Sequence, residues 1–413
     1  MNSPAGRECR FCSAPLNDTF ADLGASPLAN SFLKAQDLQR GELFYPLHVY
    51  VCASCFLVQL PELSSPADIF SDYAYFSSYS KSWLDHARRF AAMAVDRFAL
   101  GPDSLVVEIG SNDGYLLHYF KEAGVPVIGV EPASNVAAAA REKGIKTINR
   151  FFDHNLAEEL AAGGSKADLI VGNNVLAHIP DVGTLMRGLK KLLKPGGTIS
   201  MEFPHLLSLV GGNQFDTIYH EHYSYYSLTT ADTVFSSYGL TIYDLEFLPT
   251  HGGSLRIFAG HESNPSARRR KSVAEALERE EMAGLKSIQY YRRFDETVRA
   301  HKRKILNFLI AAKEQEKSIA AYGAAAKGNT MLNYCGVGTD FIDYCVDRSP
   351  HKQGTYLPGS RIPVYGPEKV SETRPDYLVI MPWNLKEEIS EQMAAIRDWG
   401  GRFVTLVPRV EVF

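Results

Sequence analysis

The stretch that decides the fold is Ser104–Leu117, "SLVVEIGSNDGYLL". Its first half is an apolar run typical of a buried strand, and its second half is a glycine-bearing turn that leads into a helix. A second apolar run, Val125–Pro132, "VPVIGVEP", follows and ends in an acidic residue. A strand, a helix and a second strand in this order predict a parallel βαβ unit, with a ligand crevice at the carboxyl ends of its strands.

Two further strands extend this sheet. They lie in "ADLIVGNNVLAHIPD" and "KPGGTISMEFP", and a helical segment precedes each. Beyond them, Thr241–His261, "TIYDLEFLPTHGGSLRIFAGH", contains two β-rich runs separated by the turn residues "LPTHGG". This spacing predicts an antiparallel hairpin after the parallel strands.

The turn "EIGSNDG" lacks the G-x-G-x-x-G fingerprint of dinucleotide-binding proteins. With Glu131 at the end of the next strand and "LKPGG" further on, it resembles the first motif of S-adenosylmethionine-dependent methyltransferases, and class I members of that group end in an antiparallel hairpin. In this interpretation Gly110 and Gly114 let the backbone approach the amino-acid end of the cofactor, and Glu131 accepts both ribose hydroxyls. The residues predicted to bind the cofactor are Glu108, Gly110, Asn112, Gly114, Glu131 and Asn173.

Four of the six cysteines form two C-x-x-C pairs, "CRFC" and "CASC". Two such turns supply four thiolates in a tetrahedron, which suits a closed, structural Zn²⁺ site. Unrelated free thiols or a redox pair are the alternatives, but no βαβ pattern surrounds either pair. The predicted zinc ligands are Cys9, Cys12, Cys52 and Cys55.

Composition restricts the class of protein. A chain of 413 residues with 45% hydrophobic and 22% charged residues is expected to form two or three globular domains. The net charge of −4 opposes nucleic-acid binding, which relies on clustered Lys and Arg. The start "MNSPAGRECRFC" does not read as a signal peptide, and no apolar run is long enough to cross a bilayer. We therefore expect a cytoplasmic protein with reduced thiols and no membrane partner.

An unusual polar cluster, Tyr219–Ser227, "YHEHYSYYS", follows the "GTISMEFP" strand and is predicted to overhang the crevice as a loop at its rim. It is a poor metal site, because His220 and His222 alternate and the helical H-E-x-x-H spacing is absent. It suits acid–base chemistry: a histidine titrates near neutrality, a carboxylate can orient it, and tyrosines can donate to an oxyanion. A second aromatic cluster, "DYAYFSSYSKSW", either folds over the same site or packs between the N-terminal module and the central domain.

Taken together, these motifs resemble the sugar-nucleotide C-methyltransferases that build branched deoxysugars, over nearly the whole chain. The resemblance implies methylation at C3 of a 4-keto-6-deoxy nucleotide sugar by S-adenosylmethionine, with His222 as general base. It also implies that Tyr219 and Glu221 surround the keto sugar, and that His178 and Tyr75 complete the site. Tyr73 and Tyr79 are alternatives to Tyr75. The motifs that carry the resemblance are the two C-x-x-C pairs, "YAYFSSYSKSW", "VVEIGSNDGYLL", "GVEPA", "NNVLAHIPD", "YHEHYSYYS" and "HGGSLRIF".

The C-terminal third begins with a long charged segment whose apolar residues recur at helical spacing. After it, "SIAAYGAAAKGNTML" predicts a strand, a glycine-containing turn and a helix that open a second α/β unit. Backbone amides at that helix start, beside Lys327, suit a pyrophosphate; a lysine that faces water is the alternative. The resemblance implies that this unit and the central domain enclose the nucleotide sugar, with Arg256, Lys327 and Asn329 as substrate contacts.

The sequence thus predicts an α/β protein with a central class I, Rossmann-like methyltransferase domain, a small N-terminal zinc-binding module and a second Rossmann-like α/β domain. The expected boundaries are 1–70, 71–262, 263–317 for linking helices, and 318–413. The predicted function is C3-methylation of a 4-keto-6-deoxy sugar nucleotide through an enolate. Methylation at oxygen or at another carbon acid, and a non-catalytic zinc-containing binding protein, remain alternatives.

Overall fold

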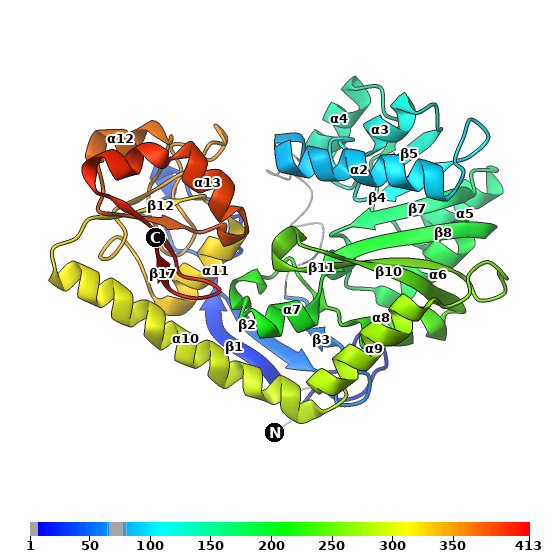
Figure 1. Cartoon of the computed structure of the whole chain (residues 1–413), viewed down its shortest axis with the longest axis horizontal. Helices are drawn as coiled ribbons and strands as arrows, with labels where there is room; N and C mark the ends of the chain where they lie inside the picture. The colour runs from blue at the N-terminus through cyan, green and yellow to red at the C-terminus, as the bar shows by residue number, and fades with distance from the viewer. Residues whose placement is uncertain (1–6, 64, 66–76, 80) are drawn as a thin grey trace.

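Three sheets organise the chain in the computed structural model, which describes residues 7–63, 65, 77–79 and 81–413 (Figure 1). The central sheet has seven strands in the order β10-β11-β8-β7-β4-β5-β6. Five of them pair in parallel, whereas β11 runs antiparallel to both β8 and β10, as predicted for the hairpin. The strands are β4 (Val106–Ile109), β5 (Val127–Val130), β6 (Thr147–Ile148), β7 (Ala167–Asn173), β8 (Leu193–Pro204), β10 (Leu240–Leu248) and β11 (Ser254–His261).

Helices cover both faces of this sheet because its strands are apolar on both faces. On β4, Val106 packs in one cluster with Phe90 and Phe120, and its neighbour Val107 packs in another with Leu185. The first layer contains α2 (Lys81–Arg97), α3 (Leu117–Glu122) and α4 (Ser134–Glu142), which lie at the top of Figure 1. The second layer contains α5 (His154–Ala162), α6 (Val182–Leu192) and α8 (Leu228–Ser237).

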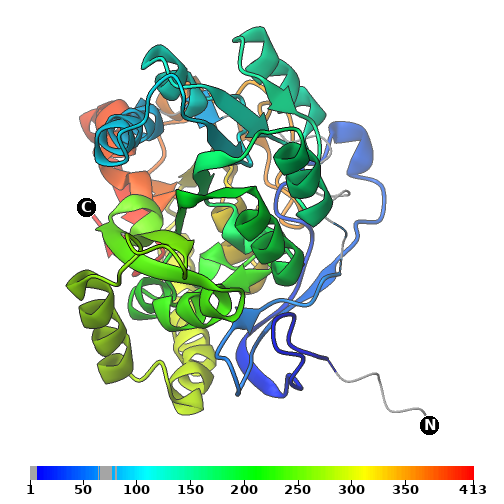
Figure 2. The ribbon, with the colours of Figure 1, turned by 90° about the vertical axis from the view of Figure 1, so that its right-hand side faces the viewer.

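The N-terminal module is a small antiparallel sheet of β1 (Asp18–Ser26), β2 (Tyr45–Val51) and β3 (Val58–Gln59). Its fourth strand, β9 (Ser224–Tyr225), comes from the middle of the chain, in the polar cluster Tyr219–Ser227, which we call the histidine loop. Strands β3 and β9 pair antiparallel. Figure 2, which is turned by 90° from Figure 1, shows the N-terminal strands beside the central domain. The histidine loop was predicted to lie at an open rim, but it is buried because this module covers it.

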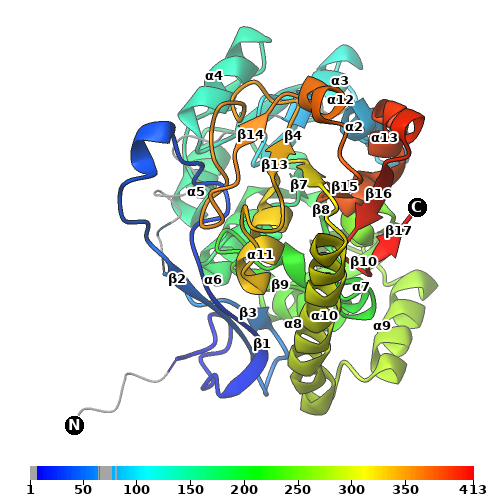
Figure 3. The same ribbon diagram turned by 90° about the vertical axis from the view of Figure 1, so that its left-hand side faces the viewer.

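Two helices, α9 (Lys271–Ala283) and α10 (Ile288–Glu314), link the central sheet to the C-terminal unit. The predicted apolar stripe of α10 is buried, and its Phe294 stacks on Phe20 of β1 at a centroid distance of 4.7 Å. Figure 3 shows α10 passing beside β1 and α11. The linking helices therefore hold the N-terminal module as well as the two larger sheets.

The second α/β unit is confirmed. Its six-stranded sheet has the order β14-β13-β12-β15-β16-β17, parallel except for the last pair. The strands are β12 (Ile319–Tyr322), β13 (Tyr344–Val346), β14 (Val364–Tyr365), β15 (Tyr377–Ile380), β16 (Arg402–Thr405) and β17 (Glu411–Val412). The helices are α11 (Ala326–Cys335), α12 (Glu368–Thr373) and α13 (Lys386–Gln392).

A buried carboxylate on α9 fixes the helix that follows the histidine loop. Glu280 accepts hydrogen bonds from the backbone N–H of Leu228 at 2.6 Å and of Thr229 at 2.7 Å, the first residues of α8, and from Nε2 of His205 at 2.6 Å. Its charge lies at the positive end of the α8 dipole. Burial alone would raise the pKa of Glu280, but the hydrogen bonds from His205 and Thr229 hold it below the ordinary value.

We expect Glu280→Gln to lower the free energy of unfolding by about 2–4 kcal/mol, because the amide cannot replace a carboxylate that accepts from several donors. The folded-state pKa is depressed, so this contribution is complete above the unfolded pKa near 4.5 and is lost as the pH falls through the folded value. Urea unfolding at pH 7 and pH 4 measures both effects. Glu281→Gln, on the exposed side of α9, is the matched control, and an equal loss in both variants would contradict the assignment.

Candidate active site

The glycine turn after β4 adopts the conformation that its sequence predicts. Gly110, Asn112 and Gly114 all have left-handed backbones, with φ of +65°, +48° and +76°. A Cβ atom at Gly110 would lie 2.7 Å from Cγ2 of Val175, so a larger residue is excluded there for steric as well as conformational reasons. The turn therefore brings the backbone to the carboxyl edge of the sheet, next to the end of β7.

Glu131 lies directly beside this turn. Its Oε2 accepts the backbone N–H of Asn112 at 2.9 Å, and its Oε1 accepts that of Ala133 at 2.8 Å. Burial nevertheless raises the pKa of the carboxyl group. The two backbone bonds fix the carboxylate and leave lone pairs on both oxygens for ligand hydroxyls.

The ends of β4 and β7 carry polar groups that suit a charged ligand. Glu108 is wholly buried, and burial together with the nearby charges of Glu131 and Asp113 raises its pKa well above the ordinary value. Neither polar atom of the Asn173 amide has a hydrogen-bond partner among the residues that the structure describes. A ligand with an ammonium and a sulfonium charge would relieve the repulsion among these carboxylates and give the amide a partner, so the residues fit S-adenosylmethionine.

His222 lies at the centre of the histidine loop and is buried. Its Nδ1 lies 2.8 Å from the backbone oxygen of Thr217. A carbonyl oxygen only accepts, so Nδ1 carries the ring proton and Nε2 carries a lone pair. Burial, with the neighbouring His178, lowers the pKa of His222 well below its ordinary value. The imidazole is therefore neutral near pH 7 and able to accept a proton at Nε2.

Two other predicted catalytic residues lie against His222. The ring centroid of Tyr219 is 4.0 Å from that of His222, and the centroid of His178 is 4.7 Å away. Nδ1 of His178 donates to the backbone oxygen of Glu221 at 2.7 Å, and burial lowers the pKa of His178 to about 4. The structure thus brings two neutral imidazoles and a phenol together. Tyr75 lies outside the residues that the structure describes.

The carboxylate of Glu221 has a different partner from the one that acid–base reasoning suggests. Its Oε1 accepts a hydrogen bond from Nδ2 of Asn30 at 2.6 Å, in the N-terminal module. The backbone carbonyl of Thr217, rather than a carboxylate, orients His222. Glu221 therefore ties the histidine loop to the N-terminal module, and its proposed contact with the substrate stays a prediction.

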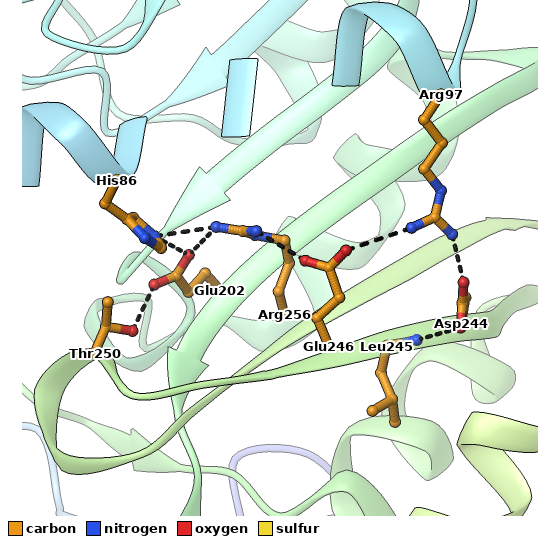
Figure 4. A network of polar contacts seen from close by, with 8 residues as sticks. All are labelled: His86, Arg97, Glu202, Asp244, Leu245, Glu246, Thr250 and Arg256. Atoms are coloured by element: carbon orange, nitrogen blue, oxygen red, sulfur yellow. Dashed lines mark hydrogen bonds and ion pairs between the residues drawn. The ribbon is translucent and has the colours of Figure 1, made fainter. Parts of the chain in front are cut away.

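Among the predicted substrate contacts, Arg256 is occupied inside the central domain (Figure 4). It donates to Oε2 of Glu202 at 2.7 Å and to Oε2 of Glu246 at 2.9 Å, and its side chain is almost wholly buried. Nε2 of His86 lies 2.8 Å from the same oxygen of Glu202. Arg256 serves this internal network, and its contact with a substrate stays a prediction.

Lys327, in the first turn of α11, lies near the histidine loop. Its Nζ is 3.2 Å from Oδ1 of Asn384 and 4.7 Å from the ring centroid of Trp383. Trp383 donates its indole N–H to Asp216 at 2.7 Å. Burial raises the pKa of Asp216 to about 6, and the positive charge of Lys327 opposes that rise. The same charge also lowers the pKa of His222, so Lys327 acts on the site electrostatically.

The third predicted contact from this region, Asn329, points toward the N-terminal module. Its Nδ2 donates to the backbone oxygen of Ala29 at 2.7 Å, and the residue is buried. Sequence reasoning missed Asp216, which interacts electrostatically with Lys327, and His251, whose charge would lower the pKa of His222. For His251 a signal was present: a histidine stands immediately before two glycines in the turn of the hairpin.

The four N-terminal cysteines form one cluster, as predicted: their Sγ atoms all lie within 4.8 Å of one another. The contact of Cys9 with Cys55, at 3.6 Å, lowers the pKa of Cys9 to about 4 and raises the pKa of Cys55. Two adjacent thiols cannot both ionise without a cation, and four sulfur ligands suit structural Zn²⁺. Gln59 donates its side-chain N–H to Cys9 at 3.1 Å and pairs through its backbone with Ser224, so the metal site is connected to the histidine loop.

We therefore expect metal removal to loosen the histidine loop. In chelator-treated protein, amide exchange in peptides covering 219–227 should become about tenfold faster or more, because β9 loses its ordered partner. Hydrogen-exchange mass spectrometry measures this. Peptides of β12 and β15, in the C-terminal sheet, serve as the internal control. An unchanged exchange rate in the loop of metal-free protein would show that the two parts are independent.

Comparison with known proteins extends these findings. The chain matches the family models "C-methyltransferase C-terminal domain" at residues 249–408, "Putative zinc binding domain" at 9–70 and "Methyltransferase domain" at 83–245. It is 38% identical to the C-methyltransferase NovU of Streptomyces niveus, across 98% of this chain and 96% of the relative. The ubiquinone biosynthesis O-methyltransferase of Rhodopseudomonas palustris (strain BisA53) is 27% identical over 32% of this chain and 59% of its own length.

Among solved structures, the 1,6-didemethyltoxoflavin-N1-methyltransferase of Burkholderia thailandensis aligns with 50% of this chain and 94% of its own, at 19% identity and a TM-score of 0.35. No helix in the described part of the chain has the length and apolar character of a membrane span. The likeness to NovU covers the N-terminal module and the C-terminal unit as well as the cofactor-binding domain, so this protein belongs to the C-methyltransferase family: it is an enzyme that transfers a methyl group from S-adenosylmethionine to carbon, with structural zinc in its N-terminal module.

Proposed function

We propose that the enzyme methylates C3 of a 4-keto-6-deoxy sugar nucleotide, through an enolate that His222 generates. The observation that carries this proposal is the hydrogen bond from Nδ1 of His222 to the Thr217 carbonyl, which leaves Nε2 as a proton acceptor in a buried site. A carbon–hydrogen bond is not nucleophilic, so methylation at carbon requires that its proton be removed first. A neighbouring ketone makes that proton acidic enough for an imidazole base.

The proposed reaction has two stages. Nε2 of His222 takes the proton from C3, and the electron pair of the C–H bond moves onto the C4 carbonyl oxygen. The pair then returns to form the new C3–methyl bond as the sulfur–methyl bond breaks. S-adenosylmethionine supplies an electrophilic methyl group and leaves as the neutral thioether. The proton on Nε2 is released to water before the next turnover.

The neutral state of His222 supports this role. Burial and the charges nearby hold its pKa well below the ordinary value, so the base form predominates throughout the neutral range. His178 and Tyr219 lie against the same ring and could exclude water from one side of it. A base positioned in this way contributes about 10²–10⁴-fold to the rate.

The nucleotide end of the substrate is assigned to α11. Lys327 lies in the first turn of this ten-residue helix, where backbone N–H groups and the helix dipole favour an anion. Burial lowers the pKa of Lys327 while the neighbouring Asp216 opposes the shift. An anionic diphosphate close to this lysine would stabilise its charged form, so we propose that Lys327 binds the pyrophosphate.

We expect His222→Ala to reduce kcat by about 10²–10⁴-fold and to leave the affinity for S-adenosylmethionine nearly unchanged. His220→Ala is the matched control, because His220 lies in the same loop with its ring near Tyr45 and Pro46 of the N-terminal module. Radiolabelled methyl transfer and calorimetry measure the two quantities. A parallel loss of cofactor affinity in His222→Ala would count against the assignment.

In the wild type, the acid limb of the kcat/KM profile should fall below pH 6.5, since the base has a lowered pKa.

Incubation with a panel of 4-keto-6-deoxy sugar nucleotides in D₂O tests the reaction itself. With a substrate of the proposed class, deuterium should enter at C3 before methylation, since proton removal does not require the methyl donor. Mass and proton-resonance analysis of recovered substrate and product detects this. Methylated oxygen without C–H exchange would instead support O-methylation.

We expect Lys327→Met to raise KM for the sugar nucleotide about 10–100-fold, because a charge-assisted bond of about 1.5–3 kcal/mol is lost. The affinity for S-adenosylmethionine should stay nearly the same. Lys369→Met, which removes an exposed lysine of α12, is the control. Steady-state kinetics measure KM, and an unchanged KM in Lys327→Met would remove this residue from the substrate site.

A further inference from the structure

His251 occupies a strained position in the turn between β10 and β11. Its φ is +53°, in the left-handed region, and its ring is hydrogen-bonded to a second non-glycine residue with a left-handed backbone. That residue, Asn174, has a φ of +57° directly after β7, and its Nδ2 lies 3.1 Å from Nε2 of His251. Left-handed backbones are uncommon for residues other than glycine, and they cluster at functional sites where the surrounding fold imposes them.

The surroundings of this turn hold His251 firmly. A Cβ atom on Gly252 would lie 2.3 Å from Cη2 of Trp383, and Gln214 donates to the backbone oxygen of Gly252 at 2.8 Å. The ring centroid of Trp83 lies 5.4 Å from that of His251. The turn is thus packed between the central sheet and the C-terminal unit, and its imidazole has little freedom to move.

The contact with Asn174 also assigns the ring protons. The amide N–H of Asn174 donates to Nε2, so Nδ1 of His251 carries the proton and is a hydrogen-bond donor. Burial, together with the positive charge of Lys327, lowers the pKa of His251 to about 4; Glu202 opposes the shift and His86 adds to it. His251 is therefore a neutral donor near pH 7, as an uncharged imidazole that polarises a carbonyl must be.

His251 lies at the carboxyl edge of the central sheet, because its partner Asn174 directly follows Asn173, the last residue of β7, whose amide has no partner among the described residues. A charge on His251 would lower the pKa of His222, and Lys327 acts on both rings. The two imidazoles differ in what they present: Nε2 of His222 is an acceptor, whereas Nδ1 of His251 is a donor. Removal of a proton beside a ketone needs both functions, one at the carbon and one at the oxygen.

We propose that His251 is a further catalytic residue, whose Nδ1–H donates to the substrate carbonyl oxygen as negative charge develops there. This inference rests on the proposed function. The ring proton stays on Nδ1 throughout. The electron pair of the broken C–H bond resides on the oxygen while His222 holds the proton, and it returns to carbon when the new C–C bond forms and the sulfur–methyl bond breaks. Asn174 is a positioning residue, which fixes the tautomer and direction of the ring.

The test is the rate of C–H exchange in D₂O with a 4-keto-6-deoxy sugar nucleotide and no methyl donor. His251→Gly removes the ring and suits the left-handed backbone, so the fold should tolerate it. We expect exchange and methyl transfer to fall together by about 10²–10³-fold, the loss typical of one oxyanion donor. The affinity for S-adenosylmethionine should be unchanged, and added imidazole should restore part of both rates.

His261→Gly, at the end of the same hairpin, is the matched control, since Nε2 of His261 lies 3.3 Å from the backbone oxygen of Leu193, at the start of β8. It should keep the wild-type exchange rate. Wild-type exchange in His251→Gly would overturn this inference while the proposed function stands. A loss confined to methyl transfer, or to cofactor affinity, would overturn it as well. Absence of exchange in the wild type would refute the proposed function itself.

Discussion

The pairing of β3 with β9 is the constraint on which the site depends. Nine consecutive polar and aromatic residues, 219–227, cannot form a core, and a loop of this composition inside a crevice would leave buried backbone groups without partners. As the fourth strand of the N-terminal sheet, β9 satisfies part of that backbone, and Leu60 donates to the carbonyl of Tyr223 beyond it. The N-terminal module therefore fixes the position of the histidine loop, although none of the histidines of that loop belongs to the module.

Backbone carbonyls, rather than carboxylates, set the protonation of this site. Thr217 and Glu221 each present a backbone oxygen to Nδ1 of a histidine, His222 and His178 respectively. A carboxylate in the same position would raise the pKa of the imidazole and favour its charged form. With neutral carbonyls as partners, burial instead lowers the pKa of both rings, and the charge of Lys327 adds to the shift at His222. The site is thus arranged to begin its reaction with uncharged imidazoles.

The sequence predicts the structural features that short local motifs determine. The strands and glycine turn around Gly110, the β10–β11 hairpin and the four cysteines are each recognisable from a local pattern, and the structure confirms them. The sequence could not predict that β3 pairs with a strand more than 160 positions away, because a two-residue strand has no periodic signal. Nor could the sequence assign the partners of Glu221 and Arg256, since the same charged residue type can face a substrate or an internal polar partner.

A lowered pKa opposes the role of a base, and the proposed reaction accounts for this opposition. Burial weakens His222 as a base in isolation, because an imidazolium is poorly solvated there. Proton removal from carbon, however, creates a positive ring and a negative oxygen together, inside one poorly solvated site where opposite charges attract strongly. Lys327 disfavours the imidazolium, yet in the proposed reaction the same charge would favour the oxyanion and the diphosphate. Under this proposal, the surroundings that lower the pKa of His222 in the free enzyme become stabilising only when the substrate supplies a negative charge, so that the transition state is favoured over the resting state.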